Sequence, residues 1–187
     1  YRWSPPEVSR WQQRSFLGYQ RPDGQVGTRN YWLVVPLVFC ENRNLQALKE
    51  AFEEELGYAQ PKIYRQQVAE LARLYQQGRV QDARPAVTLE SAPVQRPRVF
   101  QNLDGIKFLA HEGGCGGTRE DSHNLCALLA GYIHHPNVAG ATVLSLGCQN
   151  AQVQILREQI ASRDPKFSKA LLVFDQQQSG SEYKMLS

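Results

Sequence analysis

The feature that most constrains the fold of this chain is a regular alternation of apolar runs and amphipathic segments in its second half. Short apolar runs at 105–111, 140–147 and 169–175 are separated by segments with helical periodicity at 118–135 and 150–162. Short apolar runs between polar segments are typical of strands that are buried on both faces. The alternation therefore predicts an α/β, Rossmann-like three-layer domain, with a mainly parallel sheet of about four or more strands flanked by helices.

The first half extends this pattern with one further strand and two helices. The run "YWLVVPLVF" at 31–39 predicts a buried strand, and Pro36, which has no amide donor, indicates an edge position or a nearby bulge. Helices are expected at 42–57, ending at Gly57, and at 64–77. The residues expected on the buried sides of the helices are Leu45, Leu48, Phe52 and Leu56, then Val68, Leu71, Ala72 and Tyr75, then Leu125, Leu128, Leu129 and Tyr132, and finally Val153, Leu156 and Ile160.

The domain organisation is less regular towards the beginning of the chain. Residues 1–15 carry prolines and charges without a period and are expected to form a linker or arm, so that 16–187 is the α/β domain. Pro-Asp-Gly at 22–24 predicts a turn or hairpin. Residues 79–104 are expected to contain short strands around Val87 and Val99, because long structureless connections are rare in compact domains. The chain begins with Tyr1, and we expect it to be a fragment of a longer protein.

Composition excludes several classes of function. The net charge is +3 and the basic residues are scattered, so nucleic acid is not an expected partner. No segment is apolar for long enough to span a bilayer, and no secretory signal opens the chain. The four cysteines of this core-rich chain are expected to be free thiols in a reducing cytoplasm.

Three of the four cysteines directly follow predicted strands. Cys40, Cys115 and Cys148 come after the first, second and third strands, whereas Cys126 lies inside a helix and is expected to be buried. Because the carboxyl ends of parallel strands meet at one edge, where ligands bind, these three thiols are expected to face a common rim. His111 and the loop 176–179, which contains Gln177, should lie at the same rim.

The segment "HEGGCGG" at 111–117 is the most unusual loop of the chain. Its glycines allow a tight turn and close approach to a ligand, and the helix that follows begins at a capping box of Thr118 and Asp121. Three kinds of site remain open from the residues alone. They are a metal site with cysteine and histidine ligands, an anion-binding nest, and a redox or nucleophilic thiol with His111 or His123 as its base. A Walker loop is excluded, because no Gly-Lys-Ser/Thr follows the glycines.

Four motifs together resemble the altronate and galactarate dehydratase family, with the altronate branch the most similar. They are "GYQRPDGQVGTRNYWLVVPLVFC", "HEGGCGG", "HHPNVAGATVLSLGCQN" and "FDQQQSGSE", which span roughly residues 16–182. The resemblance implies a hydro-lyase that converts a sugar acid such as altronate into a 2-keto-3-deoxy acid, with a divalent metal, Fe²⁺ in the first place and Mn²⁺ as an alternative. It implies that further domains lie on both sides of this one and that the present chain, as a fragment, is inactive alone. The implied substrate is a small-molecule sugar acid, and self-association is left open.

Matched to the family motifs, the residues take the following expected roles. His111 and Cys115 are the catalytic candidates, and the metal candidates are Cys40, Cys115 and Cys148. The substrate-binding candidates are Gly113, Gly114, Gly116, Gly117, Arg29, Asn30 and Gln177. Arg29 and Asn30 precede the first strand, however, so they are expected at the opposite edge of the sheet, and an alternative is that they bond loop carbonyls or a neighbouring domain. Gln149 stands where many members have Glu, which argues against acid/base chemistry at that position. The runner-up functions are an anion-binding module with packed thiols and a thiol-redox protein.

Overall fold

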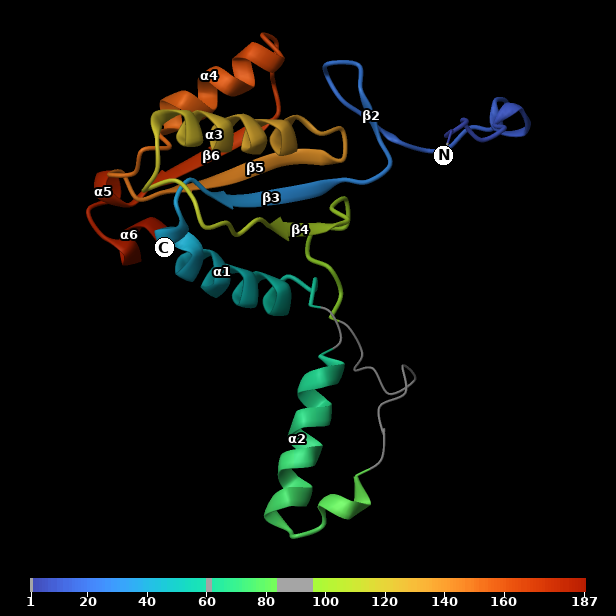
Figure 1. The fold of residues 1–187 in the computed structure, drawn as a ribbon, viewed down its shortest axis with the longest axis vertical. Coiled ribbons are helices and arrows are strands. Elements are labelled where there is room, and N and C mark those ends of the chain that lie inside the picture. The colour runs from blue at the N-terminus through green and yellow to red at the C-terminus, as the bar shows by residue number, and fades with distance from the viewer. Residues whose placement is uncertain (1, 60–61, 84–95) are drawn as a thin grey trace.

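Four parallel strands form the centre of the domain. The computed structural model describes residues 2–59, 62–83 and 96–187. Its main sheet has the order β4-β3-β5-β6, and all three pairings are parallel. The strands are β3 (Tyr31–Pro36), β4 (Gly105–Phe108), β5 (Val138–Ser145) and β6 (Ala170–Asp175). The predicted α/β fold with a parallel sheet is confirmed (Figure 1).

Helices cover both faces of this sheet, as a three-layer domain requires. Figure 1 shows α3 (Arg119–His134) and α4 (Val153–Arg163) on one face and α1 (Asn42–Glu55) on the other. The larger core lies under α3 and α4, and the smaller one joins Val34, Leu45 and Leu144 beneath α1. Short helices α5 (Gln176–Ser179) and α6 (Glu182–Leu186) follow β6.

Pro36 does not mark an edge strand, so this prediction is wrong. β3 is a central strand with β4 on one side and β5 on the other. The β3–β5 register shift lies at Tyr31 and Trp32, at the far end of the strand from Pro36. Leu37 donates its amide to the Leu144 carbonyl on the β5 side, so Pro36 faces the β4 side. The last β4 residue, Phe108, pairs with Val34, so the missing Pro36 amide falls where β4 has already ended.

The buried face of α3 is rotated from the predicted one. Leu129 is buried as predicted and Leu125 is partly buried, but Leu128 is 58% exposed and Tyr132 is 48% exposed. The positions that α3 buries are Ser122, Cys126, Leu129, Ala130 and Ile133. Apolar residues occur almost all around this helix, so the sequence period alone does not decide which stripe meets the sheet.

The second predicted helix forms as α2 (Ile63–Gln76), but its predicted stripe is not buried. Val68 is 65%, Leu71 48% and Tyr75 77% exposed, and Leu74 is the buried position. Figure 1 shows the reason, because α2 stands away from the sheet and covers neither face of it. The predicted stripes of α1 and α4 agree with the structure, with Leu45, Leu156 and Ile160 buried.

The N-terminal part contains the predicted hairpin. β1 (Tyr19–Gln20) and β2 (Val26–Gly27) pair antiparallel, with Gly24 at φ +86° in the turn. Residues 2–17 are exposed and contain one short 3₁₀ turn, η1 (Ser9–Trp11). Further 3₁₀ turns are η2 (Phe39–Glu41) and η3 (Val80–Asp82).

Two remaining predictions concern strands and the membrane. Val99 lies in a bend and not in a strand, whereas Val87 lies outside the described residues. Among the described residues, no helix combines the length and apolar character needed to cross a bilayer.

Candidate functional site

The loops that follow β3, β4 and β5 are bonded directly to one another at the carboxyl edge of the sheet. The Phe39 amide donates to the Gly113 carbonyl at 2.9 Å, and the Asn150 and Ala151 amides donate to the Gly114 carbonyl at 2.9 and 3.1 Å. The glycine loop 111–117 therefore lies between the other two loops and joins them. The predicted meeting of these loops at one edge is confirmed, and we take this edge as the candidate functional site of the domain.

Two of the four glycines are required by this close approach and by backbone conformation. Gly114 has φ +101°, and a Cβ atom there would lie 2.0 Å from the Leu37 carbonyl oxygen. Gly117 has φ +92°, and its Cβ would meet the Asp121 carboxylate at 2.6 Å. A Cβ on Gly116, in contrast, would meet nothing within 4 Å, so its surroundings are open. Gly113 and Gly114 already use their carbonyls to hold neighbouring loops, which leaves Gly116 as the open position of the four.

His111 fixes the loop from its first residue. Its Nε2 lies 2.7 Å from the Pro36 carbonyl oxygen, and its Nδ1 accepts the Gly113 amide at 3.2 Å. A carbonyl can only accept, so Nε2 carries the proton and Nδ1 does not. Asn42 adds a third bond by donating its side-chain amide to the His111 carbonyl at 2.8 Å. Both ring nitrogens are therefore committed to backbone groups, an arrangement suited to positioning the loop.

The three predicted thiols all lie at this edge and are exposed. Cys40 is in η2, Cys115 is in the glycine loop, and Cys148 follows β5. Their sulfur atoms do not all lie within 4.8 Å of one another. Among the described residues, one group of three possible metal ligands drawn from His, Cys, Asp and Glu meets that spacing, and it contains no cysteine. Cys126 is fully buried as predicted, and burial raises the pKa of its thiol to about 11.

A chain of buried hydrogen bonds connects the β5 loop to the end of β6. Gln149, 1% exposed, donates to Ser145 Oγ at 2.7 Å, and Ser145 donates to Asp175 at 2.7 Å. The Gln149 oxygen accepts the Gly147 amide at 2.7 Å. Gln177 lies against Gly147 at the same edge, since a Cβ on Gly147 would lie 2.7 Å from the Gln177 oxygen. Gln149 is thus a structural amide, in keeping with the sequence argument against acid/base chemistry there.

Glu41 is a buried carboxyl group at this edge that the sequence analysis did not single out. It is 1% exposed; its Oε2 accepts a bond from Asn44 at 2.9 Å, whereas Oε1 is buried with no partner. Burial raises the pKa of Glu41, and the nearby carboxylates of Glu182 and Asp175 raise it further, against a lowering by the Asn44 bond. The signal that could have found it is its place directly after Cys40, at the carboxyl end of a buried strand.

A cavity of about 360 Å³ opens beside the glycine loop. The residues that line it are Gly117, Arg119, Ser122, His123, Asn150 and Ile155. It lies at the first turn of α3, where the capping box predicted from Thr118 and Asp121 is present. Asn150 ties the cavity to the thiol loop by donating to the Cys115 carbonyl at 2.7 Å. A guanidinium and a helix N-terminus make this cavity suitable for an anion.

Arg29 and Asn30 lie at the other edge of the sheet, before β3 begins. The Arg29 guanidinium donates to the Thr28 carbonyl at 3.2 Å. Asn30 is buried, its amide nitrogen donates to Asp104 at 2.7 Å, and its side chain donates to the Asn102 carbonyl at 2.7 Å. The structure therefore places both residues away from the thiols, in the loop-bonding arrangement that was the alternative prediction.

Comparison with known proteins gives one family and two curated relatives. Residues 18–187 match the family described as D-galactarate dehydratase/altronate hydrolase, second domain. The altronate dehydratase of Bacillus subtilis (strain 168) is 24% identical over 172 residues, which cover 90% of this chain and 26% of that protein. The altronate dehydratase of Escherichia coli (strain K12) is 24% identical over 148 residues, 79% of this chain and 22% of that protein.

No solved structure matches the chain. The chain spans about a quarter of the length of the curated relatives it matches. The family match covers nearly the whole α/β domain, including every loop of the carboxyl edge. The chain therefore belongs to the D-galactarate dehydratase/altronate hydrolase family and corresponds to its second domain.

Proposed function

We propose that this chain is part of a dehydratase that removes water from a sugar acid, with conversion of altronate to 2-keto-3-deoxygluconate as the specific reaction. The observation that carries the proposal is the family match over 18–187, which includes the three bonded loops of the carboxyl edge. Both matched relatives are named altronate dehydratases, which supports the specific substrate. Both relatives are longer, so domains outside these 187 residues are the proposed partners that complete the site.

The cavity beside α3 is the proposed position for the substrate carboxylate. Arg119 supplies a fixed positive charge, and the α3 N-terminus supplies its dipole, although the capping box already uses the Asp121 amide and places the Asp121 carboxylate at the same turn. Loss of water between C2 and C3 requires removal of the proton next to the carboxylate, so negative charge develops on that group in the transition state. Cationic and dipolar groups that face the carboxylate stabilise this charge.

The residues of the glycine loop then divide into positioning and contact roles. His111 holds the loop through its two backbone bonds, so we propose a positioning role for it in place of the catalytic role expected from the sequence. Cys115 is exposed and its carbonyl bonds Asn150, a residue of the cavity wall, so it is the thiol proposed to contact the substrate or a metal. Gly116 gives the open approach to the cavity side of the loop.

Metal dependence, with Fe²⁺ or Mn²⁺, is a prediction that follows from the family resemblance. Thiolates are suitable donors for iron, but the spacing of Cys40, Cys115 and Cys148 does not match a set of ligands for one ion. The donor type fits and the geometry does not, so we assign no step of the reaction to a metal.

The anion-binding cavity also favours a second function, an anion-binding module in which the thiols have no chemical role. The full-length protein, purified without oxygen, should be assayed with altronate and with galactarate, with Fe²⁺ or Mn²⁺ supplied. We expect formation of a 2-keto-3-deoxy acid, a loss of kcat/KM in Arg119→Gln and in Cys115→Ser, and none in Cys126→Ala. Binding of either acid without turnover, unaffected by Cys115→Ser, would support the anion-binding module instead.

A further inference from the structure

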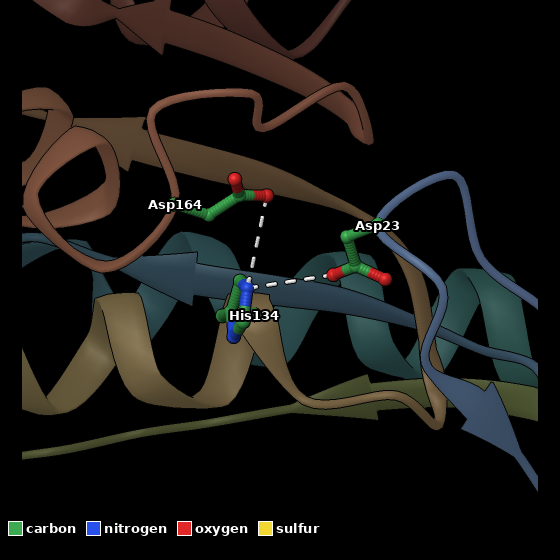
Figure 2. Close-up of side chains that lie close together, drawn as sticks. All are labelled: Asp23, His134 and Asp164. Carbon is green, nitrogen blue, oxygen red and sulfur yellow. Dashed lines mark ion pairs between the residues drawn. The ribbon is translucent and has the colours of Figure 1, made fainter.

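A group of side chains at the amino edge of the sheet, remote from the thiols, has the chemistry of a metal site. Asp23 comes from the β1–β2 turn, His134 from the last turn of α3, and Asp164 from the residue that follows α4 (Figure 2). Their ligand atoms all lie within 4.8 Å of one another, and among the described residues this is the one His, Cys, Asp and Glu group that does so. We propose that Asp23, His134 and Asp164 bind a first-row divalent transition metal ion such as Zn²⁺.

The distances between these atoms match metal ligands better than hydrogen bonds. His134 Nε2 lies 3.4 Å from Asp23 Oδ2 and 3.8 Å from Asp164 Oδ2. A charge-assisted hydrogen bond between these groups would be about 2.8 Å long. Neighbouring ligand atoms around a tetrahedral zinc ion, at the usual bond lengths, are about 3.4 Å apart. The imidazole and the two carboxylates thus lie close together without bonding tightly to one another, and the Gln25 amide nitrogen, 3.3 Å from His134 Nε2, would have to turn aside for an ion.

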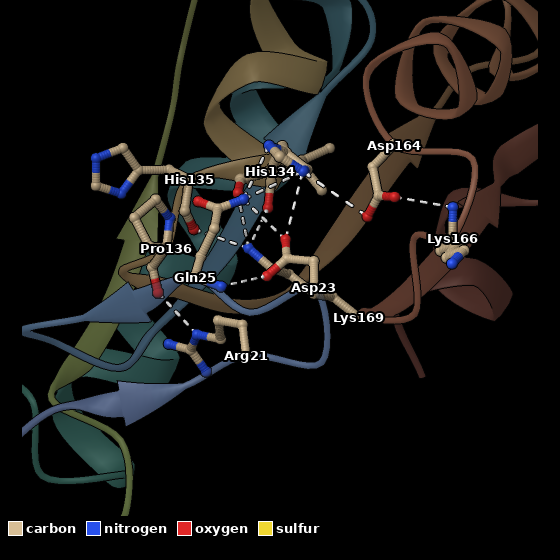
Figure 3. A network of polar contacts seen from close by, with 10 residues as sticks. Arg21, Asp23, Gln25, His134, His135, Pro136, Asp164, Lys166 and Lys169 are labelled. Carbon is tan, nitrogen blue, oxygen red and sulfur yellow. Dashed lines mark hydrogen bonds and ion pairs between the residues drawn. The ribbon is translucent and has the colours of Figure 1, made fainter.

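Local backbone bonds aim both carboxylates at this point. Asp23 Oδ1 accepts the Gln25 amide at 3.0 Å, and Asp164 Oδ1 accepts the Lys166 amide at 2.8 Å. In each case the second oxygen, Oδ2, is the one that faces His134. The Gln25 side chain also donates to Asp23 Oδ2 at 2.8 Å, and it lies beside the imidazole ring (Figure 3). Outer hydrogen bonds of this kind orient metal ligands in proteins.

Two of the cations near this group, Lys169 and Arg21, are directed to backbone carbonyls. Lys169 Nζ donates to the carbonyls of His134 and His135 at 2.9 and 2.8 Å, at the C-terminal end of α3 (Figure 3). Arg21 donates through Nε to the Pro136 carbonyl at 2.7 Å. The positive charges of Lys169 and Arg21 repel a metal ion. These two side chains bond to carbonyls and not to the carboxylate oxygens that face His134, so those oxygens can still bind the ion. One imidazole and two carboxylates suit Zn²⁺ and its neighbours, and water molecules would complete the coordination.

A metal ion here would connect three elements that are far apart in the chain. It would tie the N-terminal hairpin to the C-terminal ends of α3 and α4, so its expected role is to stabilise this edge. This inference is independent of the proposed reaction, because none of its ligands lies at the carboxyl edge.

The test is Zn²⁺ binding by chelator-treated protein whose exposed thiols have been alkylated, which removes Cys40, Cys115 and Cys148 as ligands. We expect calorimetry to show one more equivalent of bound Zn²⁺ per chain in the wild type than in His134→Ala or Asp164→Asn. Zinc should also raise the Tm of the wild type by several degrees and have a smaller effect on these variants. The matched control is His135→Ala, because His135 is adjacent and exposed but outside the group.

Equal zinc stoichiometry in the wild type and in both variants would overturn the proposal, as would loss of the same equivalent in His135→Ala. Asp164→Asn keeps the side-chain volume and the Oδ1 acceptor, so the comparison stands even where His134→Ala fails to fold. Neither readout uses dehydratase activity, so failure of the proposed function would leave this result unaffected.

Discussion

The two edges of the sheet hold their loops together in different ways. At the carboxyl edge, backbone amides and carbonyls of three loops bond one another directly, and Gly114 makes room for this approach. At the amino edge, polar side chains also make connections: Lys169, next to β6, donates to carbonyls at the end of α3, and Asn137 accepts the amides of Thr28 and Arg29, which follow the hairpin. The comparison teaches that at the carboxyl edge the loops touch directly through their backbones at Gly114, with His111 and Asn150 adding side-chain bonds, whereas the link from the hairpin to the loop before β5 relies on the Asn137 side chain. Four predictions test it, from the largest expected effect to the smallest.

Gly114→Ala should be the most damaging single change at the carboxyl edge. It forces a side chain into φ +101° and within 2.0 Å of the Leu37 carbonyl oxygen. We expect a loss of about 3 to 5 kcal/mol in the free energy of unfolding, from backbone strain and overpacking together. Denaturant unfolding measures it, and Gly116→Ala is the matched control, because a Cβ there meets nothing within 4 Å. Equal stability of the two variants would show that the loop approach is not tight.

Asn137→Ala should be the corresponding change at the amino edge, with a smaller effect. The Asn137 side-chain oxygen accepts the Thr28 amide at 2.8 Å and the Arg29 amide at 3.2 Å. Its removal should cost about 1 kcal/mol and speed hydrogen exchange of these two amides. Asn137→Asp retains the acceptor and should retain most of their protection. Unchanged exchange in the alanine variant would mean that the hairpin is held by other contacts.

Glu41→Gln, at the carboxyl edge, should change how the free energy of unfolding depends on pH. Burial raises the pKa of Glu41 in the folded protein above the ordinary pKa that it has in the unfolded chain. As the pH rises, the unfolded chain therefore loses this proton before the folded protein does. Between the two pKa values the folded state binds more protons, and the contribution of Glu41 to stability falls as pH rises. The glutamine variant lacks this penalty, so its stability relative to wild type should increase from acidic to neutral pH. Parallel unfolding curves for the two proteins across that range would contradict the buried carboxyl group.

Thiol labelling should distinguish the carboxyl edge from the core without a change in stability. Cys40, Cys115 and Cys148 are exposed, whereas Cys126 is buried and its pKa is raised from 9.0 to about 11. Ionisation alone should slow the reaction of Cys126 by about 100-fold, since the thiolate is the reactive form. We expect three thiols to react quickly in the native protein and the fourth after unfolding. Four fast thiols in the native protein would mean that the α3 face of the core is open.

The sequence predicted those parts of the fold that depend on neighbouring residues. The strand and helix order, the Thr118 and Asp121 capping box and the burial of Cys126 all follow from local patterns that the structure reproduces. The buried stripe of α3 was misplaced because apolar residues occur on most of its surface. The stripe of α2 was misplaced for another reason, since an amphipathic period shows which face is apolar but not whether anything covers it.

The candidate site was predictable in its location and not in its contacts. Parallel strands must end at one edge, so Cys40, Cys115 and Cys148 could be placed there from their order alone. The separation of their sulfurs, and the commitment of both His111 nitrogens to the backbone, depend on loop conformations that no period encodes. The burial of Glu41 likewise depends on what packs over it.

By itself, the sequence determined the parallel α/β sheet and the edge at which its thiol and glycine loops meet, because alternating local patterns permit few other arrangements. Only the tertiary structure decided that Asp23, His134 and Asp164 come together and that Gly114 lies against Leu37. The physical reason is that periodicity acts over a few residues, whereas these contacts join positions separated by 30 to 141 residues through the packing of the helices and the hairpin against the sheet.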